Sequence, residues 1–245
     1  MNRCRYPCFV WFEIRMQTPA PIRNTDRGRA LKGLTERQIR RREGILAAAR
    51  ELITKHGFDG VTMRELARDS GVTPKTLYSL FESKERLLLT AVEERYRYLY
   101  QMIDEAHFEH GIDRLFYIIE TVAETTRKNA EYAKALAPIL SQESVSPITA
   151  IRKAAYHRAV QQIADEGDFQ DWVDVGLINK VVYQQIIMVG QSRWYAREAA
   201  KKSTMEMTTL DLALVLRSVT EGYTHARTTE VIKDIQVKVG NAARR

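Results

Sequence analysis

Residues 62–86 read TMRELARDSGVTPKTLYSLFESKER, and this stretch carries the clearest structural signal in the chain. Thr62 is followed three residues later by Glu65, which is the spacing of a capping box, where each side chain bonds the other residue's backbone N–H. The pattern therefore predicts that a short helix begins after Thr62 and covers 63–69.

A second short helix is expected after a turn. Gly71 suits the turn, Thr73 is a good N-cap, and Pro74 is favoured at the first helical position, so the sequence predicts a helix over 74–81. Two short helices joined in this way are typical of a helix-turn-helix, whose second helix enters the major groove of DNA. The alternative interpretation is a helical pair that only packs.

The two helices have an inner and an outer face. The inner positions predict a small core made of Leu66, Ala67, Val72, Leu77 and Phe81. The outer positions of the second helix are Lys75, Thr76, Tyr78 and Ser79. A lysine there can reach the acceptor atoms of guanine, a threonine can meet a thymine methyl group, and a helix N-terminus offers N–H groups to phosphate. For Tyr78, a role as a core aromatic residue is the alternative.

The flanking sequence is helical as well. Thr35 begins another capping-box pattern, ahead of a helix over 36–55 that Gly57 should end, and Ser83 is the expected N-cap of a long helix over 84–108. Further helices are expected over 113–129, 131–142, 147–166, 171–201 and 209–239. No segment shows the two-residue alternation of a strand, so the predicted fold class is all-α.

The last two expected helices carry apolar residues on more than one face. In the first of them one stripe contains Val175, Ile178, Val182 and Ile186, and another contains Leu177, Val181 and Met188. The last helix has a similar row, formed by Leu212, Val215, Leu216, Val219 and Tyr223. Helices that are apolar on two sides need two partners, so a homodimer is expected.

The charge of the chain is concentrated at its N-terminal end. The 245 residues carry a formal net charge of +7. Residues 1–43 contain eleven basic and four acidic side chains, so they account for all of that excess, and the remainder is neutral. A local positive excess favours an acidic partner such as double-stranded DNA.

Residues 1–34 are expected to form a flexible basic arm, because three prolines and scattered arginines interrupt any helical period. Met16 is an alternative start of the chain.

The apolar run from Cys8 to Phe12 is too short for a secretion signal, and no stretch is long and apolar enough to span a membrane. The only cysteines, Cys4 and Cys8, cannot hold the rest of the chain together, which fits a cytoplasmic protein.

From Arg41 to Val92 the sequence resembles the tetracycline-repressor (TetR) family of bacterial regulators. The resemblance rests on an alanine-rich first helix that ends in HGF and on residues that follow in the family's order, namely Gly71-Val72, Leu77-Tyr78, Phe81 and Lys84-Glu85. It implies a DNA-binding domain over 35–92 with three helices, followed over 93–245 by a larger helical domain for ligand binding and dimerisation.

The resemblance also implies roles for single residues. Tyr78, Lys84 and Thr62 would clamp phosphates, whereas Lys75 and Thr76 would face bases. The full set of candidate DNA contacts in the helix-turn-helix is Thr62, Arg64, Thr73, Pro74, Lys75, Thr76, Tyr78, Ser79 and Lys84. Arg37, Arg40, Arg41 and Arg42 are expected to follow phosphates or enter the adjacent minor groove. A solvated basic tail is the alternative for the arginines, and a solvated first-turn lysine is the alternative for Lys84.

The C-terminal part contains enough aromatic residues to line a pocket for a small organic effector. Tyr117, Tyr183 and Met188 are the favoured lining residues, because they lie on central helices among apolar neighbours, although ordinary core packing is the alternative. The aromatic content fits an uncharged or weakly charged effector. His107 and His110 have a spacing that suits a metal, but no further ligands accompany them, so neither a metal nor a cofactor is expected.

The sequence lacks the phosphate-binding loops, nucleophile elbows and dinucleotide fingerprints of common enzymes, so no enzymatic activity is expected. The expected function is that of a transcriptional regulator, a repressor that a ligand releases from a palindromic operator. A helical ligand-binding or interaction module that does not read DNA specifically is the rival interpretation.

Overall fold

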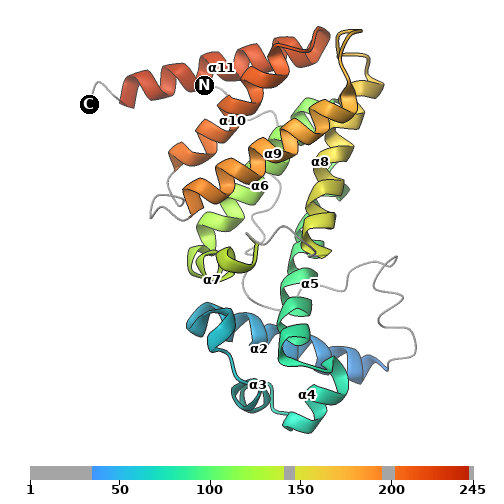
Figure 1. The fold of residues 1–245 in the computed structure, drawn as a ribbon, viewed down its shortest axis with the longest axis vertical. Coiled ribbons are helices and arrows are strands. Elements are labelled where there is room, and N and C mark those ends of the chain that lie inside the picture. The colour runs from blue at the N-terminus through green and yellow to red at the C-terminus, as the bar shows by residue number, and fades with distance from the viewer. Residues whose placement is uncertain (1–34, 141–146, 195–201, 243–245) are drawn as a thin grey trace. The chain divides into compact units, whose positions relative to one another are not determined.

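The computed structural model describes residues 35–140, 147–194 and 202–242, and these residues form an all-α fold (Figure 1). The described segments contain ten helices and no β-strand, and the one β-bridge among them joins Phe169 to Thr220. The expected fold class is confirmed. Within the described residues, no helix is long and apolar enough to cross a membrane. The expected arm over 1–34 lies outside the described residues.

The chain divides into two compact units, Met1–Val92 and Glu93–Arg245. From residue 35 onward, the first unit contains three complete helices and the beginning of a fourth, which are α2 (Glu36–Gly60), α3 (Met63–Asp69), α4 (Pro74–Phe81) and α5 (Lys84–Glu105). Gly57 has non-helical dihedral angles inside α2, so the expected break occurs there, although helical turns continue to Gly60. The predicted capping boxes at Thr35 and Thr62 are both present.

A small core joins the helices of the first unit. Four of the five residues predicted for the inner face are buried, namely Leu66, Ala67, Leu77 and Phe81. Val72 is only half-buried, because it lies in the turn, where its backbone N–H donates to the Ala67 carbonyl at 2.9 Å. The core also includes apolar residues of α2 and α5, namely Ile45, Leu46, Ala49, Leu52, Ile53, Leu87, Leu88 and Ala91.

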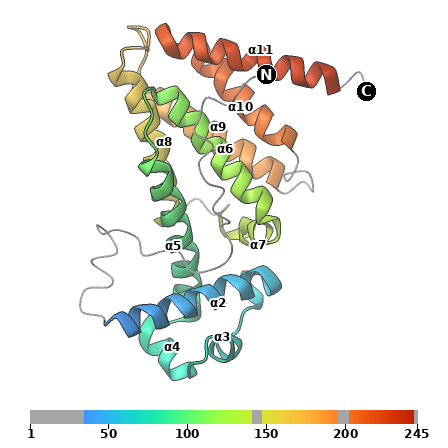
Figure 2. The ribbon, with the colours of Figure 1, turned by 180° about the vertical axis from the view of Figure 1, so that it is seen from behind.

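In the part of the chain that the structure describes, the second unit contains the rest of α5 and six further helices. These are α6 (Gly111–Lys128), α7 (Ala130–Leu140), α8 (Pro147–Asp165), α9 (Val175–Trp194), α10 (Lys202–Arg217) and α11 (Gly222–Ala242). Helices α10 and α11 lie side by side, as both views show (Figures 1 and 2). The buried faces of α5, α6, α8, α9 and α10 meet in one apolar core.

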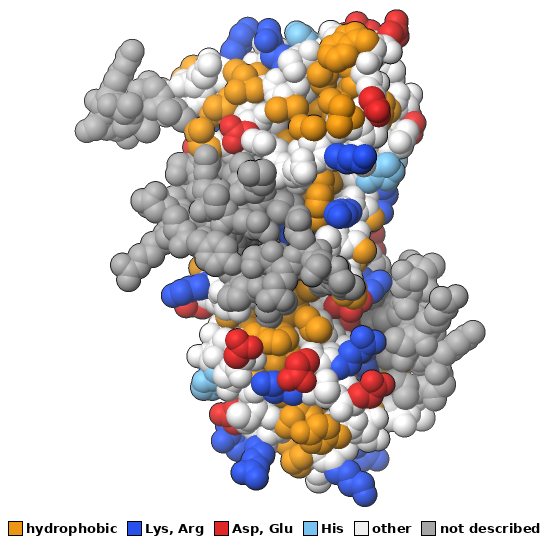
Figure 3. Space-filling view, viewed as in Figure 1, with side chains coloured by type: hydrophobic (Ala, Val, Ile, Leu, Met, Phe, Trp, Pro, Cys, Tyr) orange, Lys and Arg blue, Asp and Glu red, His pale blue; other side chains and the backbone are white. Residues whose placement is uncertain are grey.

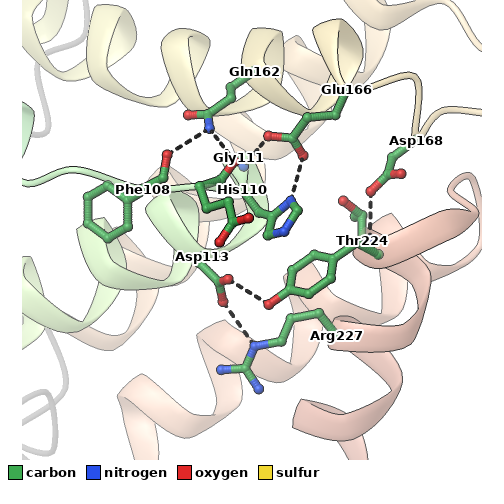
Figure 4. Close-up of polar contacts among 11 residues, drawn as sticks. Phe108, His110, Gly111, Asp113, Gln162, Glu166, Asp168, Thr224 and Arg227 are labelled. Atoms are coloured by element: carbon green, nitrogen blue, oxygen red, sulfur yellow. Dashed lines mark hydrogen bonds and ion pairs between the residues drawn. The ribbon is translucent and has the colours of Figure 1, made fainter. Parts of the chain in front are cut away.

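The long helix expected over 84–108 ends three residues early, at Glu105. The cause is a tertiary contact, because the Gln162 side chain on α8 donates to the carbonyls of Phe108 and Glu109 at 3.2 and 3.3 Å (Figure 4). The Phe108 ring also packs against Tyr117, with ring centroids 5.1 Å apart. The chain therefore turns, and α6 begins at Gly111 instead of 113.

The single helix expected over 209–239 was a wrong prediction, since this region forms two helices, α10 and α11. The break is fixed by Asp168, which follows α8. Its carbonyl accepts from the Glu221 N–H at 2.8 Å, and its carboxylate accepts from the Thr224 N–H at 2.6 Å (Figure 4). Gly222 stands at the break with a φ of 59°, and a Cβ there would lie 2.3 Å from the Asp168 carboxylate.

The start of α9 also differs from the expected helix over 171–201. The helix begins at Val175, because the Asp174 carboxylate accepts from the Leu177 N–H at 3.0 Å and so acts as a cap. Val182 and Ile186 are buried in the core, whereas Leu177 of the second stripe is exposed. Residues 195–201 lie outside the described residues.

Candidate nucleic-acid interface

The two helices of the helix-turn-helix are held at their N-termini by local hydrogen bonds. The Thr62 hydroxyl accepts from the Glu65 N–H at 3.2 Å, and the Glu65 carboxylate accepts from the Thr62 N–H at 3.1 Å. The Thr73 hydroxyl accepts from the Thr76 N–H at 3.3 Å at the start of α4. Gly71, with a φ of 64°, forms the turn between the helices. These bonds fix the start of each helix without a distant partner.

The outer face of α4 is accessible to a partner. Lys75 and Ser79 are exposed, and the Tyr78 side chain is 52% exposed. The alternative of a core role for Tyr78 is therefore wrong. Thr76 is half-buried, and its hydroxyl lies 3.0 Å from that of Thr73, so a base contact would have to come from its methyl group or its second lone pair.

The remaining candidates of the helix-turn-helix lie around this face. Thr62, Arg64, Thr73 and Pro74 are exposed at the N-terminal ends of α3 and α4. Lys84 is half-buried at the start of α5, where its Nζ atom donates to the Asp59 carbonyl at 3.4 Å. An ammonium group has three N–H donors, so Lys84 retains donors for a phosphate while this contact limits its position.

The arginine cluster at the start of α2 is not uniform. Arg37 and Arg41 are exposed. Arg40 forms an exposed ion pair with Glu36 at 3.2 Å, and Arg42 lies over the Phe81 ring at 5.5 Å from its centroid. The position of Arg42 on the core of the first unit gives it a packing role that sequence reasoning did not predict.

Leu80 is a candidate contact that sequence reasoning missed. It is 42% exposed on α4, two positions after Tyr78, where it can meet a thymine methyl group or a deoxyribose. The sequence could have indicated this exposure, because Leu80 does not belong to the buried face of α4 that contains Leu77 and Phe81. Figure 3 shows an apolar patch between cationic side chains at the α3–α4 end of the first unit.

Charges on α3 are partly neutralised by their own neighbours. The hydrogen bonds from Thr62 lower the pKa of Glu65, and the bond to Asp69 raises the pKa of Arg68. The Arg68 side chain contacts the Asp69 carboxylate at 2.8 Å. Arg64, in contrast, has no ion pair among the described residues, which leaves its guanidinium available for phosphate.

The candidate ligand residues lie in the second unit. Tyr183 is buried on α9 within the apolar core, and Tyr117 on α6 packs against that core from the side. The side chain of Met188 lies outside the described residues. The structure therefore brings Tyr117 and Tyr183 to the same core.

The two histidines with metal-ligand spacing do not share a helical face. His107 follows the end of α5, whereas His110 is the N-cap residue of α6. The His110 ring stacks on Tyr223 at a centroid distance of 3.7 Å and lies 3.6 Å from the Glu166 carboxylate. No group of three potential metal ligands occurs among the described residues.

Comparisons with known proteins agree on one family. The sequence model described as bacterial regulatory proteins, tetR family, matches residues 45–91, which cover most of α2 and all of α3 and α4. The chain is 26% identical over 122 residues to the HTH-type transcriptional regulator UidR of Escherichia coli, a match that covers 49% of this chain and 61% of UidR. It is 29% identical over 104 residues to the HTH-type transcriptional repressor KstR of Mycolicibacterium smegmatis, covering 42% of this chain and 51% of KstR.

A solved structure extends the similarity to the second unit. The transcriptional regulator FadR from Bacillus subtilis, in complex with stearoyl-CoA, aligns with a TM-score of 0.57 at 18% sequence identity. The alignment covers 70% of this chain and 96% of FadR, so the fold is shared over both units. The matches to the curated relatives span about half to three fifths of their lengths.

Proposed function

We infer that this chain, whose N-terminal unit belongs to the tetR family of bacterial regulatory proteins, is a DNA-binding transcriptional regulator that represses from a palindromic operator until a small organic ligand releases it. The observation that carries this proposal is the exposed outer face of α4, held by local caps and surrounded by cations. Residues 35–92 would form the DNA-binding domain, and residues 93–245 the ligand-binding and dimerisation domain. We propose no catalytic activity and a cytoplasmic location, where the operator lies.

In this proposal, the N-terminal part of α4 recognises the DNA sequence. Lys75 is exposed and reaches guanine acceptors, while Thr76 and Ser79 contact neighbouring base edges. Tyr78 and Lys84 bind phosphates on either side. Thr62, Arg64, Thr73 and Pro74 complete the backbone contacts from the exposed ends of α3 and α4.

The arginines of α2 would extend the phosphate contacts. Arg37 and Arg41 are exposed and have the freedom to follow the DNA backbone, and Arg40 can exchange its exposed pair with Glu36 for a phosphate. Arg42 contributes less, because it is held over Phe81. The basic side chains of residues 1–34 would add to the electrostatic attraction for DNA.

A homodimer supplies two copies of α4 to a palindromic operator. Large apolar side chains are exposed on the last two helices, with Leu214 at 50%, Tyr223 at 41% and Val237 at 63%. We propose that these side chains contact the second subunit. The two recognition helices would then lie about 34–36 Å apart, or a multiple of this spacing, to meet successive major grooves.

Ligand binding in the second unit would shift the population between DNA-binding and released forms. FadR was solved with stearoyl-CoA, which supports an organic ligand within this fold. We propose that Tyr117, Tyr183 and Met188 line the site. Helix α5 carries residues of both units, so it is the element through which the ligand acts.

The first experiment selects operator DNA from a random pool and measures its affinity by fluorescence anisotropy near physiological salt. The region upstream of the protein's own gene is included as a probe, and a scrambled duplex is the reference. We expect the selected site to bind at least about 10³-fold more tightly than the reference. Equal binding to both would overturn the proposal and favour a helical interaction module without specific reading.

Three variants of the interface separate base reading from backbone binding. Tyr78→Ala and Lys84→Ala should weaken binding to every sequence alike, whereas Lys75→Ala should also lose about 1–3 kcal/mol of discrimination at one base pair. Lys55→Ala is the matched control, because Lys55 is an exposed cation on α2 outside the candidate contacts. Equal losses on operator and scrambled DNA for Lys75→Ala would contradict its base-reading role.

The dimer is tested by sedimentation of the full chain. Leu214→Glu and Val237→Glu place charges on the exposed apolar surface of α10 and α11 and should shift the protein toward monomer. Met102→Glu, at an exposed apolar residue of α5, is the control, because Met102 lies outside the helices from which the dimer is inferred. A monomeric wild-type protein would contradict the proposed assembly.

A further inference from the structure

The loop between α8 and α9 carries an exposed tryptophan. Trp172 is 71% exposed, more than any other large apolar side chain in the described part of the chain. Leu177, on the first turn of α9, is also exposed. An indole has a large apolar area, and tryptophan is enriched among the residues that dominate the affinity of protein interfaces. Trp172 is therefore a candidate anchor for a partner.

The loop that carries this tryptophan is fixed to the rest of the second unit. Its backbone pairs with the segment between α10 and α11, where the Gln170 N–H donates to the Val219 carbonyl at 3.2 Å. The Glu221 N–H donates to the Asp168 carbonyl at 2.8 Å. A turn follows, in which the Val173 N–H donates to the Gln170 carbonyl at 2.9 Å. Both ribbon views show the loop beside the start of α11 (Figures 1 and 2).

The indole ring itself is held by its polar atom. Trp172 Nε1 donates to Gln170 Oε1 at 2.9 Å, and Gln170 belongs to the same turn. This bond orients the ring while most of its surface remains exposed. Because the loop and the ring are already positioned, a partner that binds here loses little conformational entropy on the side of this protein.

The charges around the tryptophan are negative, although the chain as a whole has a formal net charge of +7. Residues 159–179 contain five carboxylates and no lysine or arginine. Asp171 and Asp174 are exposed on either side of Trp172, and Glu221 is exposed on the segment paired with the loop. Figure 3 shows acidic side chains next to apolar ones at the end of the second unit where α8 ends and α11 begins.

The five carboxylates differ in what they do inside the fold. Glu166 accepts from the Gly111 N–H, and Asp168 accepts from the Thr224 N–H, so both are used to join helices. Asp171, in contrast, makes no bond to another described residue and is exposed next to the indole. Its charge is available to a cation from outside.

We propose that the loop around Trp172 is a docking surface for a basic peptide segment of a protein partner. An arginine or lysine of that segment lies over the exposed face of the indole, and the neighbouring carboxylates accept hydrogen bonds from it. Tryptophan is the aromatic side chain that attracts cations most strongly, and the planar guanidinium of arginine also stacks on aromatic rings. A negatively charged surround with an aromatic centre is complementary to such a segment.

This docking surface goes beyond the proposed function, because it lies outside the candidate DNA contacts and the candidate ligand residues. A second copy of the chain fits it less well, since contact of the surface with itself would bring carboxylates together. The partner is therefore defined by its chemistry, as a segment with exposed lysine or arginine side chains.

The test uses two fluorescein-labelled peptides and the full-length protein. One peptide is an octapeptide in which glycine and arginine alternate, and the other has citrulline, which is similar in shape but uncharged, in place of each arginine. Fluorescence anisotropy near physiological salt gives the Kd values. We expect the arginine peptide to bind at least about tenfold more tightly than the citrulline peptide. Equal Kd values for the two peptides would overturn the inference.

Variants assign the binding to this loop. Trp172→Ala should weaken the arginine peptide about fivefold, and Trp172→Phe should retain part of the affinity because it keeps an aromatic face. Asp171→Asn should weaken binding about twofold. Glu120→Gln is the matched control, because Glu120 is an exposed carboxylate on α6, and it should have no effect. An unchanged Kd in Trp172→Ala would overturn the inference.

NMR gives a readout on the wild-type protein itself. The indole N–H resonance of Trp172 is identified by its absence from the spectrum of Trp172→Phe. It should shift when the arginine peptide is added and stay in place with the citrulline peptide. Binding of the arginine peptide without such a shift would place the peptide elsewhere and overturn the inference.

Two other occupants have their own signatures, and either result would overturn the inference of a separate partner. A shift of Trp172→Ala toward monomer in sedimentation would assign the surface to a second copy. The chain's own arm would be the occupant if the peptide bound more tightly to a full-length variant in which four of its cations are replaced by glutamine, namely Arg23, Arg27, Arg29 and Lys32. We expect neither change.

Discussion

The two units satisfy their polar groups in different ways. In the first unit, the hydrogen bonds that fix α3 and α4 join residues three positions apart, such as Thr62 with Glu65 and Thr73 with Thr76. In the second unit, the bonds that fix the start of α6 and hold α11 join residues far apart in the chain. The Gly111 N–H donates to the Glu166 carboxylate at 2.8 Å, and the Tyr223 hydroxyl donates to Asp113 at 2.9 Å (Figure 4).

The difference has a consequence for function. Local bonds form wherever the short motif occurs, so the helix-turn-helix keeps its geometry while its outer face remains free to contact DNA. Distant bonds hold only when the whole second unit is assembled, so a change of packing at one place in this unit can affect several of its helices.

The largest expected effect follows from a change at Gly111. A Cβ there would lie 2.6 Å from two backbone atoms of α8, the Ala159 carbonyl oxygen and the Ile163 nitrogen. Gly111→Ala should therefore lower the free energy of unfolding of the second unit by about 3 kcal/mol. Gly71→Ala, where space is open but φ is 64°, should cost about 1 kcal/mol in the first unit. Hydrogen exchange, measured separately for the residues of each unit, gives both losses of stability. Similar losses in the two variants would contradict the contrast between the units.

Removal of the Asp168 carboxylate should have the next largest effect. Asp168 is 8% exposed, and it holds the start of α11 through the Thr224 N–H. Asp168→Ala should cost about 2 kcal/mol, because the buried N–H loses its acceptor. Increased hydrogen exchange should be confined to the second unit. Asp171→Ala, at an exposed carboxylate nearby, is the control, and equal exchange in both variants would show that Asp168 does not fix the break.

A smaller effect is expected when the cap of α4 is removed. Thr73→Ala deletes the hydroxyl that accepts from the Thr76 N–H and should cost about 1 kcal/mol in the first unit. Thr73→Ser keeps that hydroxyl and should retain most of the stability. The change should leave hydrogen exchange in the second unit unaffected, and faster exchange there would mean that the units are not separately stabilised.

The smallest expected effect concerns the pH dependence of stability. Hydrogen bonds from Thr62 lower the pKa of Glu65 in the folded protein, so the capping box contributes stability above the unfolded pKa and loses it as pH falls through the lowered folded pKa. Thr62→Ala should return the Glu65 pKa toward its usual value, whereas Thr62→Ser should not. Carboxyl chemical shifts measured by NMR during an acid titration follow this directly, and an unchanged pKa in Thr62→Ala would refute the assignment.

Much of the candidate DNA interface was predictable because its signals are local. Capping residues, a turn glycine and a short apolar period lie within about 25 residues, so they specify α3, α4 and the exposure of Tyr78. The sequence did not predict that Arg42 lies over Phe81 or that Lys84 bonds the Asp59 carbonyl, because both contacts join separate helices.

In the second unit, the sequence by itself determined that the chain is helical and that its helices bury apolar faces. Tertiary structure decided where α5 ends, because Gln162 bonds the Phe108 carbonyl, and where α10 and α11 divide, because Asp168 bonds Thr224. Periodicity records which face of a helix is apolar, but the partner of a buried polar group depends on which helices meet, and that is settled only when the whole core is packed.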